Sequence, residues 1–259
     1  MNKFLRVHLL FTILIAFVSS TTAQTLIPYS KTTFRGNKPV MYGYKNEKGD
    51  IVVKAQYLNT YEFKEGMGVV RTFSFKYGFV NEKGKEVIPA KFDYASSFSE
   101  GLASVEINDR EGYINTSGKL VIPTIYDAAD SFSEGFAAVK VNGKRGYINK
   151  NGDMVIAPQF GSAGAFADGF AEVTISNMAS IIDATGKIVT TLLYDHIDDI
   201  KNKTAIAYIG NTRYLIQLDS PKATETIYNT YEMEDGTYTG EVASPRYQPY
   251  PNGYGKMVF

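Results

Sequence analysis

Apolar residues occur along this chain in short runs separated by polar steps that end in Gly. The run Tyr77–Val80 is followed by the step Asn81-Glu82-Lys83-Gly84 and by a second run, Glu86–Ile88. An Asx residue three places before a Gly is typical of a hairpin connection, because its side chain can bond the turn backbone and Gly supplies a positive φ. The pattern predicts two antiparallel strands. Pro89, like Pro123 in the next copy, is expected to end the second strand because it cannot donate to a ladder.

This hairpin pattern recurs at a nearly constant period. Gly43, Gly78, Gly112 and Gly146 begin four near-copies and Ser180 takes the same place in a fifth, at spacings of 35, 34, 34 and 34 residues. The equivalent Asx-to-Gly steps are 46–49, 115–118, 149–152 and 183–186, and a sixth trace at 213–216 then fades. One unit holds about three short strands and cannot bury both faces alone, so neighbouring units are expected to cover each other.

Each unit also carries a second turn and two aromatic positions. The second turns are 64–66, 99–101, 133–135 and 167–169, and an aromatic residue precedes each one: Phe63, Phe98, Phe132 and Phe166. The other aromatic column consists of Tyr57, Phe92, Tyr126, Phe160 and Tyr194, and small residues recur at Ala103, Ala137 and Ala171. Large side chains repeated at one position predict an aromatic spine buried between successive units.

The predicted fold is therefore all-β, a tandem array of short antiparallel β-meander repeats. An open superhelical β-solenoid is expected, because about 34 residues is short for a four-stranded blade, which usually takes around 40. A closed five- or six-bladed β-propeller is the alternative, since closure removes an exposed last edge.

Composition and charge restrict the function classes. The chain has 259 residues, no Cys and 27 basic against 27 acidic residues. The absence of Cys excludes disulfides, thiolate metal sites and thiol catalysis. The balanced charge offers no basic surface for phosphates, so no nucleic-acid partner is expected.

Residues 1–24 have the pattern of a signal peptide. Lys3 and Arg6 precede an apolar run, and the small residues that follow place cleavage near Ala23 or Gln24. The apolar run is short for a bilayer-spanning helix, which needs roughly 20 apolar residues. An exported protein is expected, whether periplasmic, outer-membrane-associated or extracellular.

The order aromatic-Gly, Asn-x-x-Gly, Val-Ile-Pro, Tyr/Phe-Asp, Phe-x-Glu-Gly and Ala-x-Val over residues 42–207 resembles the WG repeats of bacteria, also called KWG repeats. The resemblance implies a β-rich repeat array, often exported, with no established catalytic residues and with a role in binding. The signature Trp is absent here. Its place is taken by Tyr42, Tyr77, Glu111, Arg145 and Ala179, so no role of that Trp is carried over.

The C-terminal segment is different. Residues 236–241 and 251–257 resemble a single MORN repeat, a β-hairpin unit, and the resemblance implies contact with lipid. The predicted organisation is a signal peptide (1–24), a lead-in (25–41), five WG-like repeats (42–207), a degenerate repeat with a linker (208–235) and the MORN-like hairpin (236–259).

The acidic residues of the second turns are the first candidates for chemistry. Glu65, Glu100, Glu134 and Asp168 occupy one equivalent position, whereas glycoside hydrolysis needs two carboxylates in distinct environments. A turn role is therefore favoured over catalysis.

Metal binding is the second candidate. His196 is the only His outside the leader, and a lone His without a second ligand at metal spacing is a weak metal signal. Calcium on the Asx turns is conceivable because calcium takes oxygen ligands, but no DxDxDG run is present.

We therefore expect no catalytic residues, no cofactor and no metal. The predicted function is a binding or scaffolding module of the cell envelope or extracellular space, with a protein or glycan partner that the sequence does not identify. A propeller-type glycan hydrolase and membrane-surface binding through the MORN-like end are the alternatives. The residues of the binding surface, the oligomeric state and the native C-terminus are left open.

Overall fold

All regular elements of the described residues are β-strands in this computed structural model. The structure describes residues 25–31, 40–198, 200–218, 223–233, 236–242, 246–249 and 255–258. Across these segments, no helix has the length and apolarity to cross a membrane. The prediction of an all-β fold made of short antiparallel units is confirmed.

The strands form small antiparallel sheets that follow one another along the chain. The first sheet is β1 (Ile27–Lys31), β2 (Met41–Lys45) and β3 (Ile51–Tyr57). Three four-stranded sheets follow: β4 (Asn59–Thr60), β5 (Met67–Arg71), β6 (Tyr77–Asn81) and β7 (Glu86–Phe92); β8 (Tyr94–Ala95), β9 (Leu102–Ile107), β10 (Arg110–Asn115) and β11 (Leu120–Tyr126); β12 (Ala128–Ala129), β13 (Phe136–Val141), β14 (Lys144–Asn149) and β15 (Met154–Phe160).

The later sheets are less regular. They comprise β16 (Phe170–Ile175) with β17 (Met178–Asp183); a five-stranded sheet of β18 (His196–Ile197), β19 (Thr204–Ile209), β20 (Thr212–Gln217), β21 (Thr224–Met233) and β22 (Gly236–Val242); and β23 (Arg246–Pro249) with β24 (Gly255–Val258).

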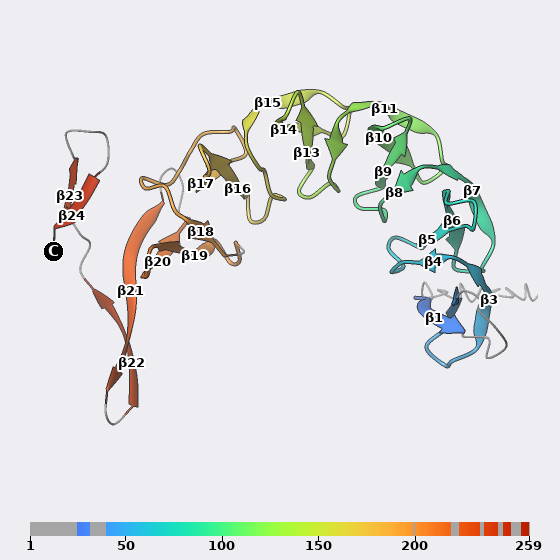
Figure 1. Ribbon diagram of the computed structural model, residues 1–259, viewed down its shortest axis with the longest axis horizontal. Helices are drawn as coiled ribbons and strands as arrows, with labels where there is room; N and C mark the ends of the chain where they lie inside the picture. Colours follow the sequence, from blue (N-terminus) through green and yellow to red (C-terminus); the bar gives the residue numbers. More distant parts are fainter. Residues whose placement is uncertain are drawn as a thin grey trace, which may run out of the picture.

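The sheets are arranged around an open arc (Figure 1). In the four-stranded sheets a seven-residue strand, such as β7 or β11, lies on the convex rim, and a two-residue strand, such as β4 or β8, lies on the inner side. We call the inner side, formed by β4, β8, β12 and the loops that follow them, the concave face. The two ends of the described array lie apart, so the array is open and not a closed propeller.

The sheets are out of phase with the sequence units by half a repeat. The unit that begins at Tyr77 supplies β6 to β9, but β6 pairs with β5 of the preceding unit, whereas β9 pairs with β10 of the following one. Val69 of one unit faces Phe79 of the next in this ladder. Each sheet is therefore completed by strands from two sequence units, which explains why a single unit does not close a core of its own.

The rim strands pass very close to the Gly that begins each unit. Tyr77 faces Phe92 but Phe79 faces Ile88, so a bulge lies between them. A Cβ atom on Gly78 would lie 2.6 Å from the backbone nitrogen of Ala90. The same collision would occur at Gly43, Gly112 and Gly146. The repeated Gly is thus required by a backbone crossing.

Two units have another residue at the position of this Gly, and they show that the crossing depends on it. In the fifth unit the side chain of Ser180 is buried and its hydroxyl bonds Thr190 at 2.8 Å. There the rim segment forms only isolated bridges, such as Ala179 with Tyr194. In the last sheet Tyr214 takes the Gly place, and β20 pairs with β21 without a register shift. Among the described sheets, the bulged crossing therefore occurs where the Cβ is absent and not where it is present.

The prediction for the prolines is wrong. Strand β7 continues through Pro89 to Phe92, and β11 continues through Pro123 to Tyr126. Both strands are the outermost of their sheets, where one edge has no partner strand among the described residues. A missing N–H is tolerated at such an edge, so these prolines stay within the strand.

The predicted aromatic spine is confirmed. Both aromatic columns are buried, and each second-turn Phe packs on an aromatic ring of the preceding sheet. Phe98 follows β8 and lies 4.9 Å from Phe79 of β6, measured between ring centroids, and Phe132 lies 4.9 Å from Tyr113 of β10. The hydroxyl of Tyr113 donates to the carbonyl of Asp130 at 2.6 Å. The core therefore lies between successive sheets, as one cluster per interface.

The ends of the chain bear on two further predictions. The signal-peptide segment, residues 1–24, lies outside the described residues. In the lead-in, β1 pairs with β2 and joins the first sheet. In the MORN-like segment, β22 pairs with β21, and β23 pairs with β24. The resemblance of this segment to a MORN repeat stays a prediction.

Candidate functional site

The acidic residues of the second turns have a conformation that few residue types adopt. Glu65, Glu100, Glu134 and Asp168 have φ values of 51°, 54°, 51° and 54°, and the Gly that follows each one also has a positive φ. The flanking residues close a two-residue hairpin, as Ser99 and Leu102 do with bonds of 2.9 and 3.1 Å. Two consecutive positive φ values are typical of a type I′ turn. The predicted turn position is confirmed.

These carboxylates also connect one unit to the next. Glu65 accepts the N–H of Gly101 at 2.9 Å, Glu100 accepts that of Gly135 at 3.1 Å, and Asp168 accepts that of Lys203 at 3.1 Å. Glu134 accepts the N–H groups of both Asp168 and Gly169 at 2.8 Å. The four acids therefore form a ladder along the array, which we call the turn ladder. Their oxygens bind the neighbouring turn, which is a structural role.

The Asx residues of the first turns act within their own hairpins. The side-chain oxygen of Asn81 accepts the N–H groups of Lys83 at 3.1 Å and Lys85 at 3.0 Å, and Asn115 and Asn149 make the equivalent bonds. These oxygens therefore stabilise the turn, as the sequence predicts.

His196 lies in the short strand β18. Its side chain is exposed, its Nε2 lies 3.1 Å from a carboxylate oxygen of Asp198, and its ring stacks on Tyr208 with 6.0 Å between centroids. Within the part of the chain that the structure describes, no group of three or more His, Cys, Asp or Glu side chains is placed to hold a metal ion.

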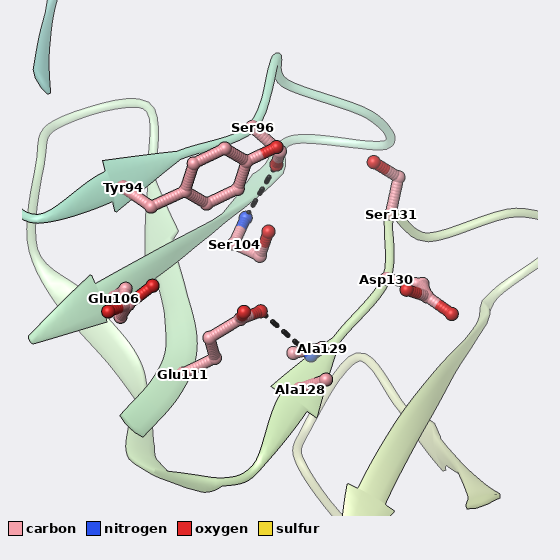
Figure 2. A pocket seen from close by; sticks show the side chains of 9 residues that line it. All are labelled: Tyr94, Ser96, Ser104, Glu106, Glu111, Ala128, Ala129, Asp130 and Ser131. Carbon is pink, nitrogen blue, oxygen red and sulfur yellow. Dashed lines mark hydrogen bonds between the residues drawn. The ribbon is translucent and has the colours of Figure 1, made fainter. Parts of the chain in front are cut away.

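A pocket of about 400 Å³ lies at the interface between the sheets β8–β11 and β12–β15, on the concave face. Its lining consists of Tyr94, Ser96, Ser104, Glu106, Glu111, Ala128, Ala129, Asp130 and Ser131 (Figure 2). Tyr94, Asp130 and Ser131 are exposed at its mouth, whereas Ser104 and Ala129 are buried at its floor. The volume lies within the range of small-molecule sites. We call this pocket the Glu111 pocket.

The Glu111 pocket is acidic. Glu106 and Glu111 are direct cross-strand partners on β9 and β10, so two negative charges face each other. One oxygen of Glu111 accepts the N–H of Ala129 at 2.8 Å. Burial, and then repulsion by Glu106 and Asp130, raises the pKa of the Glu111 carboxyl above its usual range. The Asp130 carboxylate forms an ion pair with Arg145 at the rim of the pocket.

A second pocket of about 360 Å³ lies further along the array. It is lined by Gly164, Ala165, Ala167, Glu172, Asp198, Ile200 and Lys201. Gly164 and Ala165 follow the fourth unit's rim strand at places equivalent to Asp130 and Ser131 of the Glu111 pocket. Pockets between units are therefore found at two places, with different chemistry in each.

Sequence reasoning missed the Glu111 pocket. One sequence signal could have found it: Glu111 takes the place of the aromatic residue that precedes the repeated Gly in the first two units. A second signal is that Glu106, which the hairpin pairing places opposite Glu111, carries the same charge. A like-charge pair facing a unit interface is unfavourable for stability, so packing alone does not explain this pair.

The WG containing repeat model matches five segments of the chain: residues 42–72, 77–110, 112–144, 146–177 and 180–212. These segments begin at or next to the residue pair that opens each sequence unit. A comparison with curated proteins finds no match.

Several solved structures resemble the array at low identity. The computationally designed Ika8 protein is 12% identical with a TM-score of 0.44, over 85% of this chain and 77% of that one. The WD40 beta propeller domain of Doa1 is 9% identical with a TM-score of 0.37, over 76% and 74%. BamB from Moraxella catarrhalis is 11% identical with a TM-score of 0.39, over 74% and 81%. Such scores carry no functional argument.

Proposed function

Since this chain belongs to the WG containing repeat family, we propose that it is a non-catalytic binding or scaffolding protein whose binding surface is the concave face of the array. The observation that carries the proposal is the Glu111 pocket on that face. Extended concave surfaces built from stacked units are the usual binding surfaces of repeat proteins.

The repeat contains residues that hold the array together and residues that differ between units, and this difference supports the proposed function. The aromatic spine, the crossing Gly and the turn ladder recur in successive units and hold the array together. The residues that line the Glu111 pocket differ from those at the equivalent places of the preceding unit, where Tyr61 and Tyr77 stand for Ser96 and Glu111. A specific binding surface requires positions that differ between units on a framework that recurs, and the Glu111 pocket has such positions.

A glycan hydrolase is the rival function, and the pair Glu106 and Glu111 is the observation in its favour. Retaining and inverting glycosidases place their two carboxylates on either side of the scissile bond. Glu106 and Glu111 instead lie side by side on one sheet, and Glu111 already accepts a backbone N–H. This geometry favours binding over hydrolysis.

We further propose that the protein acts in the cell envelope or outside the cell, with a protein or glycan partner. The support for export is the sequence pattern of residues 1–24. Contact of the MORN-like end with a membrane surface is a finer proposal, and flotation of the protein with liposomes, with and without residues 236–259, tests it.

The concave face is tested by a matched pair of substitutions. Ser131→Arg adds a bulky charge at the mouth of the Glu111 pocket, and Gln159→Arg adds the same charge at an exposed position of the rim strand β15. Binding of the protein to a glycan array and to isolated envelope proteins is measured for both. We expect Ser131→Arg to abolish binding and Gln159→Arg to leave it intact. Equal effects of the two variants, or turnover on a glycan panel that Glu111→Gln abolishes, would overturn the proposal.

A further inference from the structure

The Glu111 pocket exists because three large side chains of the preceding interface are replaced in it by smaller ones. In that interface Arg71 and Tyr77 are cross-strand partners, and the Arg71 guanidinium lies 5.4 Å from the Tyr77 ring centroid. The Tyr77 ring stacks on Tyr61 with 6.1 Å between centroids. One repeat later, Ser96 occupies the position equivalent to Tyr61. Glu106 and Glu111 occupy the positions equivalent to Arg71 and Tyr77. Shorter side chains at the same backbone positions leave the cavity open.

The replacement also changes the charge of the interface. A cation and two aromatic rings are exchanged for two carboxylates and a hydroxyl. Among the described residues, no ion pair involves Glu106 or Glu111, whereas the nearby Arg145 is paired with Asp130. The Ala129 N–H and the nearby Arg145 offset only part of the cost of burying the Glu111 charge, because the pKa of its carboxyl is still raised, and a bound cation would offset more of it.

The floor of the pocket holds a polar group that lacks a partner. Ser104 is 2% exposed and lines the pocket, where its hydroxyl points inward (Figure 2). Its backbone N–H donates to the Ser96 hydroxyl at 2.9 Å, but its own hydroxyl forms no hydrogen bond with any residue that the structure describes. The hydroxyl oxygen itself is open to the pocket, so it is placed to bond a ligand or a water molecule.

The mouth of the pocket is suited to a carbon chain. Tyr94 is 41% exposed, and Ala128 lies across the pocket from its ring (Figure 2). An aromatic face next to carboxylates attracts an organic cation, because the ring quadrupole adds to the charge attraction.

We propose that the Glu111 pocket binds a primary ammonium group carried on a carbon chain, as in a lysine side chain or an amino sugar. The ammonium has three N–H donors, and the pocket offers three acceptors, the carboxylates of Glu106 and Glu111 and the hydroxyl of Ser104. The carbon chain lies along Tyr94 toward the concave face. This inference rests on the proposed binding function and names the chemistry of its ligand.

Isothermal titration of the full protein at pH 7 and low salt tests the inference. The probes are Nα-acetyl-lysine methylamide and its uncharged counterpart Nα-acetyl-norleucine methylamide, with glucosamine and N-acetylglucosamine as the second pair. We expect the amine of at least one pair to bind at least tenfold more tightly than its neutral counterpart. The tighter-binding amine identifies the source. Equal binding of amine and neutral probe in both pairs, or no binding of either amine, would overturn the inference.

Substitutions in the Glu111 pocket test whether the amine binds there. Glu111→Gln keeps an acceptor for the Ala129 N–H, and Glu106→Gln changes a side chain that forms no hydrogen bond with any residue that the structure describes. Glu111→Tyr restores the aromatic residue found at Tyr77. Each is expected to weaken amine binding at least tenfold, and the exposed Glu47→Gln, with the same change of net charge, is expected to leave it unchanged. Unchanged binding in the folded variants would contradict the assignment.

The two proposals fail separately. If amine binding is absent but Ser131→Arg still abolishes binding to glycan or envelope protein, the concave face binds a ligand of other chemistry and only this inference falls. If neither the amines nor envelope components bind, the proposed function falls with it.

Discussion

The carboxylate of Glu65 accepts the backbone N–H of Gly101 at 2.9 Å, although the two residues are 36 positions apart in the chain. The bond joins equivalent turns of consecutive units, and Glu100, Glu134 and Asp168 repeat it along the array. The acids therefore serve two purposes: each occupies a positive-φ turn position, and each fixes the spacing to the next turn.

The turn ladder gives the first prediction. Glu134 accepts two N–H groups, and Glu134→Gln can accept with one oxygen only. Because the side chain is exposed, we expect a loss of about 1 kcal/mol in the free energy of unfolding. Urea denaturation measures it, and Glu47→Gln is the matched control. A loss no larger than that of the control would show that the ladder does not contribute to stability.

The crossing of the rim strand gives the second prediction. A Cβ on Gly112 would lie 2.5 Å from the carbonyl oxygens of Ile122 and Pro123, whereas a Cβ on Gly101, where φ is positive, meets nothing within 4 Å. Gly112→Ala forces a backbone shift and is expected to cost about 3 kcal/mol. Gly101→Ala is expected to cost about 1 kcal/mol, from backbone strain alone. Thermal unfolding of both variants ranks them, and the reverse order would refute the crossing as the reason for the Gly.

The Glu111 pocket gives a prediction that links stability to pH. The pKa of Glu111 is raised in the folded protein, chiefly by burial, so the folded state holds this proton more tightly than the unfolded state does. Stability is therefore lost as pH rises from the ordinary Glu range through the folded pKa, and Glu111→Gln removes that loss. We expect the variant to be more stable than the parent by about 0.5 kcal/mol at pH 7 and to show no such gain at pH 4.

Melting temperatures of parent and variant at the two pH values check this prediction. A variant that is less stable at pH 7, although its Ala129 bond is retained, would mean that the Glu111 charge stabilises the fold.

The buried tyrosines predict the alkaline limit of the fold. Burial raises the pKa of Tyr77 to about 12, and burial raises the pKa of Tyr44, Tyr113 and Tyr147 further. The folded state keeps these phenols protonated, so stability is present below the unfolded pKa of 10 and falls as pH rises above it. Phenolate absorbance and circular dichroism are followed together from pH 9 to 13. Ionisation of all 19 tyrosines near pH 10 with the fold intact would contradict the burial of these rings.

Much of the framework follows from local sequence patterns. The hairpin at Asn81 was predictable because Asx and Gly act within the turn, and the aromatic spine was predictable because Phe98 and Phe132 recur at one period. The course of β7 through Pro89 was not, because it depends on that strand being the outermost of its sheet. Edge position is a tertiary property that no local pattern carries.

The half-repeat offset and the pocket were not predicted for a related reason. Sequence similarity gives the period of a repeat but not the point at which one sheet ends and the next begins. The sequence shows that Glu111 takes the place of an aromatic residue, but it does not show that this change opens a cavity. Only the placement of Glu111 opposite Glu106, with Ser104 beneath them, identifies a cavity.

The central claim is that each sheet is completed by two sequence units and each core by two sheets. Native-state hydrogen exchange of the full protein carrying Gly112→Ala, read by mass spectrometry, tests it most directly. We predict that protection is lost in β8–β11 and also in the sheets β4–β7 and β12–β15, because their shared cores open together. Loss of protection confined to β8–β11, with both neighbours unchanged, would contradict the claim.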